Sequence, residues 1–140
     1  MCLVKKSIFP KFTLKEKIVY KVVYKSDILG TVYRTPYQYQ VITFNKEYKG
    51  EWFHDGLLET LFDSEITEGY IHSIKTLKDA IRYTRDHLFS PAYILKVVIP
   101  KHTLYWEGID NDIASRKIKY INEICEVNGN RTKIYPCGMA

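Results

Sequence analysis

The pattern of apolar and polar positions between residues 69 and 126 predicts a single strand–helix–strand–turn–strand unit. A strand is expected at Gly69–Ile74, and a continuous apolar strand at Tyr93–Ile99, which Pro100 closes. After these come an apolar segment at Thr103–Gly108 and a closing strand at Ile113–Ile124. The order of these elements indicates a fold class, but it does not indicate a reaction.

The clearest predicted helix begins at Thr76. Thr76 followed by Asp79 resembles a capping box, with aspartate in place of the usual glutamate or glutamine. One apolar stripe then recurs at helical spacing, and Ser90-Pro91 ends the helix. The stripe consists of Leu77, Ala80, Ile81, Thr84 and Leu88.

The N-terminal half is predicted to be mostly strands. Lys17–Lys25 is β-branched or aromatic at nearly every position, which is typical of a strand buried on both faces. Thr31–Thr35 and Tyr37–Phe44 look like paired strands interrupted at Pro36. The polar and acidic interval after them is expected to hold a short strand around Trp52 and a helical turn at Leu57–Phe62.

A last long strand at Lys117–Val127 completes the predicted fold. The fold class is α+β: a single domain over residues 1–127, with a curved, mainly antiparallel sheet and one principal helix. Residues 128–140, which include Gly129, Pro136 and Gly138, are expected to form an irregular C-terminal tail.

The cysteines and the lack of long apolar runs bear on where the protein is located. The three cysteines (Cys2, Cys125 and Cys137) have no CxxC spacing, which indicates reduced thiols in a cytoplasmic protein. No apolar run approaches the length of a membrane span and no targeting segment is visible, so we expect no membrane partner.

The charge of the chain is polarised. Residues 1–25 hold seven lysines and one glutamate, whereas residues 45–68 hold two lysines and seven acids. This polarity fits self-association as a homo-oligomer, or binding of a small anion, better than it fits nucleic acid.

Common catalytic motifs are missing from the sequence, including the Walker A loop, GxSxG, HExxH, GxGxxG and CxxC. His72 and Ser73 lie in a strand just before a helix, where amides and the helix dipole favour an anion. The alternative is that His72 has a structural role only, as a hydrogen-bonded residue of the core or of a sheet edge. Glu107, Asp110 and Asp112 do not match a calcium loop, so no metal and no cofactor is expected.

Arg34 lies among aromatic residues, in the run Tyr33-Arg34-Thr35-Pro36-Tyr37. An arginine can grip a phosphate while a tyrosine stacks on a base. The predicted ligand-binding residues are Arg34, Tyr37, His72, Ser73 and Arg116. The alternative is ordinary strand packing of the tyrosines, with Arg34 as a surface charge.

The chain resembles small proteins encoded by bacteriophages and gut bacteria. The likeness rests on the Met1-Cys2-Leu3 start, the Thr35-Pro36-Tyr37 segment and the turn Ile99-Pro100-Lys101-His102-Thr103-Leu104-Tyr105. It covers about residues 1–126. The resemblance implies a phage-type accessory protein, which could antagonise host defence by sequestering a nucleotide signal or by binding a host protein.

The order of elements also loosely resembles the ADP-ribosyltransferase core. That likeness implies NAD as cofactor, with Arg34, His72 or Ser73, and Glu123 as the catalytic candidates. Glu123 and Glu126 are three residues apart and so are expected on opposite faces of their strand, which does not give the paired glutamates of that family.

Three hypotheses for function follow. The first is a non-catalytic phage-type protein that binds a small nucleotide-like ligand. The second is a transferase-like enzyme that uses NAD. The third is an interaction module that docks a host protein through its basic N-terminus or its acidic segment.

Overall fold

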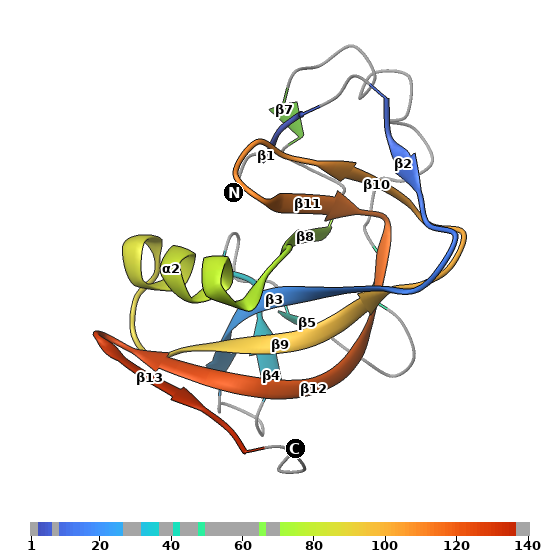
Figure 1. Cartoon of the computed structure of the whole chain (residues 1–140). Coiled ribbons are helices and arrows are strands. Elements are labelled where there is room, and N and C mark those ends of the chain that lie inside the picture. Colours follow the sequence, from blue (N-terminus) through green and yellow to red (C-terminus); the bar gives the residue numbers. More distant parts are fainter. Residues whose placement is uncertain are drawn as a thin grey trace.

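The computed structural model of the chain describes residues 3–6, 9–26, 32–36, 41–42, 48–49, 65–66 and 71–136. Within them, every pairing of strands is antiparallel, and the strands form one 11-stranded sheet and one two-stranded sheet. One helix accompanies them (Figure 1). A mainly antiparallel sheet with one principal helix agrees with the predicted α+β class.

Short strands dominate the described part of the chain, and one helix interrupts them. In chain order the elements are β1 (Leu3–Val4), β2 (Lys11–Phe12), β3 (Lys17–Ser26), β4 (Val32–Arg34), β5 (Val41–Ile42), β6 (Tyr48–Lys49), β7 (Glu65–Ile66), β8 (Ile71–Ile74), α2 (Leu77–His87), β9 (Ala92–Ile99), β10 (Leu104–Glu107), β11 (Asp112–Ser115), β12 (Lys117–Asn128) and β13 (Arg131–Ile134). The main path across the large sheet is β13-β12-β9-β3-β8-β11-β10-β2.

Three long strands form the centre of the sheet. β9 lies between β3 and β12 and pairs with both along most of its length. On β3, the consecutive residues Val22 and Val23 are both buried although they point to opposite faces. The prediction that this strand is covered on both sides is confirmed.

The helix begins and packs as its sequence predicts. The Thr76 hydroxyl accepts from the amide of Asp79 at 3.2 Å and donates to the Asp79 carboxylate at 2.7 Å. Ala80 and Thr84 are buried, and the rest of the predicted apolar stripe packs around them against the sheet. Figure 1 shows α2 lying across one side of β3 and β9.

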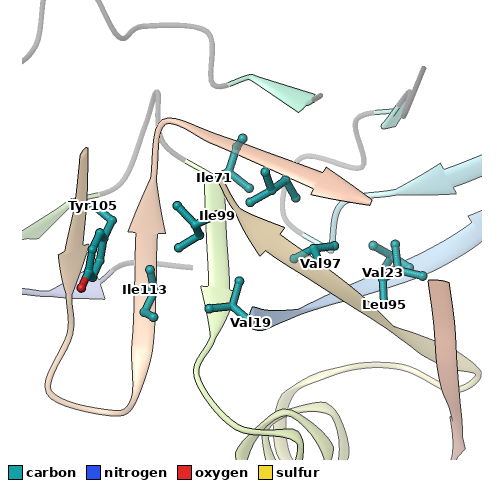
Figure 2. Packing of buried hydrophobic residues seen from close by; sticks show 9 residues of the cluster. Val19, Val23, Ile71, Leu95, Val97, Ile99, Tyr105 and Ile113 are labelled. Carbon is teal, nitrogen blue, oxygen red and sulfur yellow. The ribbon is translucent and has the colours of Figure 1, made fainter. Parts of the chain in front are cut away.

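The two faces of the central strands carry separate apolar clusters. We call the face under α2, which includes Val22, Ile94 and Cys125, the helix face. The opposite face, which includes Val19, Leu95 and Val97, is the far face. Figure 2 shows the far-face cluster, in which side chains of β3, β8, β9, β10 and β11 meet.

Two predicted boundaries are wrong. The strand expected at Ile113–Ile124 is in fact two strands, because the chain leaves the pairings with β8 and β10 at Arg116 and enters β12, which pairs with β9. The other expectation for this segment, a long strand at Lys117–Val127, agrees with β12. Residues 131–134, expected to be irregular, form β13 in a hairpin with β12. Gly129, with φ of 63°, supplies the left-handed turn residue that this hairpin needs.

The predicted strand pair after β3 is confirmed where the structure describes it. Val32–Arg34 pairs with Val41–Ile42, so β4 and β5 form a hairpin beside β3. The strand expected around Trp52 and the helical turn expected at Leu57–Phe62 lie outside the described residues.

Candidate functional site

Glu123 on β12 lies at the centre of a polar cluster. It is only 8% exposed, yet it accepts hydrogen bonds from the Tyr33 hydroxyl at 2.9 Å and the Tyr135 hydroxyl at 2.6 Å. The Lys25 ammonium pairs with it at 2.8 Å. Strands far apart in the sequence therefore meet at one carboxylate.

The protonation states in this cluster reinforce one another. Burial raises the pKa of Glu123, but the hydrogen bonds from Lys25, Tyr135 and Tyr33, together with the charge of Lys25, hold that pKa below its usual value of 4.5. Burial, and then the hydrogen bond to Glu123, raises the pKa of Tyr33 and of Tyr135. The carboxylate is thus ionised near neutral pH, and both phenols remain donors.

Aromatic rings surround the charged pair. The Lys25 ammonium lies 3.9 Å from the centre of the Tyr93 ring, a cation–π contact. The rings of Tyr33 and Tyr120 have their centres 6.3 Å apart. We call Lys25, Tyr33, Tyr93, Tyr120, Glu123 and Tyr135 the tyrosine–glutamate cluster.

A second unusual group, Lys21, lies on the far face of the same three strands. Leu95 of β9 is the cross-strand partner of Lys21 on β3 and of Glu123 on β12. Lys21 is 6% exposed, and its ammonium donates to the backbone carbonyl of His72 at 2.7 Å. Burial lowers the pKa of Lys21 from 10.5 to about 8.

The bond from Lys21 has a structural explanation. β8 pairs with β3 only at Tyr20 and Ile74, although it continues past that point toward residue 71. The ammonium reaches the carbonyl of His72 and so replaces a ladder bond between the diverging strands. Neither Lys21 nor the phenols of the tyrosine–glutamate cluster were singled out from the sequence, because lysine and tyrosine are common throughout it.

A bulge in β12 places Glu123 and Glu126 differently from the prediction. The register shifts between Glu123 and Cys125, so that Glu123 lies opposite Leu95 and Glu126 lies opposite Tyr93. Because Leu95 and Tyr93 are two residues apart on β9, both glutamates lie on the far face. The prediction of opposite faces is wrong, since the bulge adds one residue to the count.

The predicted ligand-binding residues are spread over both faces of the sheet. Ser73 is 1% exposed and lies opposite Ile113 of the far-face cluster. His72, its neighbour on β8, points to the other face and is half-buried. Arg116 is half-buried where β11 gives way to β12, and Tyr37 lies outside the described residues.

Arg34 lies on β4, opposite Tyr24 of β3 and Val41 of β5. Neighbouring residues of a strand point to opposite faces, so Arg34 points away from the side on which Tyr33 meets Glu123. The structure thus places Arg34 beside an aromatic ring of β3 and directs it away from Glu123.

The described part of the chain was compared with two patterns, a cluster of metal-ligand side chains and a long apolar helix. No group of three or more His, Cys, Asp or Glu side chains lies close enough there to hold a metal ion. None of the helices described there is long and apolar enough to cross a bilayer.

Comparison of the chain with protein-family models, with curated proteins and with solved structures found no match in any of the three.

Proposed function

We propose that the protein is a non-enzymatic, phage-type accessory protein that binds a small nucleotide-like ligand. The sequence resemblance supports the phage origin. The observation that supports binding without catalysis is the state of Glu123, whose carboxylate is already bound to Lys25, Tyr33 and Tyr135. A carboxylate held by three donors is a fixed structural anion and a poor partner for a reacting sugar.

The ligand contact is assigned to Arg34 and the aromatic residues near it. Cross-strand partners share a face, so Arg34 and Tyr24 lie side by side on the β3–β4 ladder, and both are half-buried. The Phe89 amide donates to the Tyr24 hydroxyl at 3.0 Å, which fixes the ring. An arginine beside a fixed ring is suited to a phosphate attached to a planar base.

The first test is a thermal-shift screen of the purified protein against NAD, ADP-ribose, and linear and cyclic nucleotides. A ligand present at about 100 times its dissociation constant stabilises the folded protein by about 2.7 kcal/mol, which raises the melting temperature by several degrees. We expect at least one nucleotide to give such a shift, and Arg34→Ala with Tyr37→Ala to abolish it.

Arg131→Ala is the matched control, since Arg131 is an exposed arginine on the distant β13. It is expected to keep the full shift. A nucleotide shift that survives in the Arg34 and Tyr37 double variant would remove the assigned site. A flat screen would remove the nucleotide-binding proposal altogether.

The bulge in β12 favours a second candidate, an enzyme that transfers ADP-ribose from NAD. It places Glu123 and Glu126 on one face, which brings this strand closer to the paired glutamates of the transferase resemblance. Incubation with labelled NAD and cell lysate separates the two candidates. Label transfer that is lost in Glu126→Gln would support the enzyme, and its absence would leave the binding proposal alone.

A further inference from the structure

Two turns are fastened together at one corner of the molecule. We call residues 11–16 and 100–103 the double turn; Figure 1 shows the β2–β3 and β9–β10 connections side by side at the right. Thr13 joins them through four short bonds. Its amide donates to the Thr103 carbonyl (3.0 Å) and its carbonyl accepts from His102 (2.8 Å), while its hydroxyl donates to the Pro100 carbonyl (2.6 Å) and accepts from the Thr103 amide (2.9 Å).

The buried Thr13 forces its two neighbours outward. Phe12 is 52% exposed and Leu14 is 80% exposed, although both are large apolar residues. The Phe12 ring also lies against the ring of His102, with their centres 5.8 Å apart. The double turn therefore presents apolar side chains to solvent from a backbone that is already ordered, so ordering them on binding costs little conformational entropy.

Lysines surround these apolar side chains. Lys11, Lys15 and Lys101 are exposed within the double turn. Lys11 pairs with Glu107 at 3.2 Å, whereas Lys15 and Lys101 belong to none of the ion pairs seen among the described residues, and Glu16 is the one acid within the double turn. Exposed apolar side chains among cations indicate a partner that offers both negative charge and an apolar interior.

We propose that the double turn is a docking surface for an anionic lipid membrane. Phe12 and Leu14 enter the boundary between headgroups and acyl chains, and the lysines attract the anionic headgroups. The prediction of no membrane partner rested on the lack of a spanning segment, and a contact with the membrane surface requires none.

The composition of the double turn favours lipid over the alternatives. The centres of protein interfaces are enriched in aromatic residues and arginine and depleted in lysine, whereas the double turn contains one phenylalanine, no arginine and three lysines. Nucleic acid would use the lysines, but the bases of a single strand stack on aromatic rings and not on an exposed leucine. A fluid bilayer accepts a protruding turn without a matching cavity.

The test is co-sedimentation of the full chain with vesicles of phosphatidylcholine alone and with about 30% phosphatidylserine added. We expect binding to the anionic vesicles only, weakened by raised salt. Each lysine near a charged surface contributes about fivefold in affinity, so Lys15→Glu with Lys101→Glu should weaken binding about 25-fold or more. The vesicle binding that remains at high salt depends on the apolar side chains, so Phe12→Ser with Leu14→Ser should remove most of it.

Matched controls come from the opposite end of the molecule. Phe89→Ser with Ile134→Ser replaces equally exposed apolar residues, and Lys78→Glu with Lys133→Glu repeats the charge reversal. Both control pairs should bind as the native chain does, and a melting curve for each variant confirms that it folds.

Three results would overturn the proposal. One is no sedimentation with anionic vesicles at low salt. Another is an equal loss of vesicle binding in a control pair, which would indicate that the net charge of the protein, and not the double turn, attracts it to the vesicles. The third is tighter binding to a labelled oligonucleotide than to vesicles with the same dependence on Phe12 and Leu14, which would make nucleic acid the partner.

Discussion

Lys21 carries a buried charge that opposes folding. Its side chain is buried on the far face, and among the described residues its ammonium makes one hydrogen bond, to the His72 carbonyl. Burial lowers the pKa of Lys21 from 10.5 to about 8, so between these two values the unfolded chain binds more protons than the folded one. The folded protein therefore becomes more stable as pH rises across this interval. Below the interval, Lys21 is protonated in both states and adds no pH dependence to the free energy of unfolding.

We predict that Lys21→Met removes this pH dependence. Near pH 7 the variant should be the more stable protein by about 2 to 3 kcal/mol, because methionine fills the same space without a buried charge. The advantage should shrink as pH rises from about 8 toward 10. Urea unfolding at pH 7, 8.5 and 9.5 measures it, with the exposed Lys119→Met as control. An advantage that stays constant with pH would contradict the assigned cause.

The hairpin of β12 and β13 shows how one backbone position decides an element. Gly129 has φ of 63°, and a Cβ built there would meet nothing within 4 Å, so only backbone strain opposes a side chain. The Gly129 amide donates to the Ser90 hydroxyl at 2.6 Å, which ties the turn to the segment after α2. The element therefore depends on the left-handed conformation of one residue.

Gly129→Ala is expected to destabilise the protein by about 1 kcal/mol, since a left-handed conformation costs an L-residue that amount. Asn130→Ala, in the next position of the same turn, should change stability by less than about 0.5 kcal/mol because Asn130 is exposed. Urea midpoints of the two variants test this. Equal midpoints would show that the turn tolerates a side chain.

The tyrosine–glutamate cluster joins segments that lie far apart in the sequence. Tyr33 and Glu123 are 90 residues apart, and Tyr135 reaches the same carboxylate from the residue that follows β13. Through this one anion, β3, β4, β12 and the C-terminal hairpin are held together. The double turn ties another pair of distant segments in the same way, through Thr13 and Thr103.

Glu123→Gln is expected to destabilise the protein by about 3 kcal/mol, because it leaves the Lys25 ammonium and two phenols around a neutral group. The pKa of Glu123 lies below its ordinary value in the folded state. The native protein should therefore lose this contribution as pH falls below about 4.5, and the variant should not. Unfolding titrations at pH 7 and pH 4 compare them.

The control is Glu126→Gln, since Glu126 shares the far face but belongs to none of the ion pairs seen among the described residues. It should change stability by less than about 0.5 kcal/mol. Similar losses in both variants would mean that the cluster acts through general charge and not through its bonds.

Local chemistry in the sequence was enough to predict several elements. The cap at Thr76, the apolar stripe of α2, the doubly buried β3 and the closure of β9 before Pro100 all follow from residues within a few positions of one another. Spacing and side-chain type suffice there, because the physical cause lies within a turn of helix or a single strand.

The meeting of distant side chains, by contrast, follows from the fold alone. The bulge after Glu123 reverses the expected face of Glu126, and no local pattern marks it, because an inserted residue looks like any other in the sequence. The donors around Glu123 and the burial of Lys21 arise from strand order and register, which long-range pairing sets. The sequence could therefore name Glu123 as a candidate, but only the fold shows that its carboxylate already holds three partners.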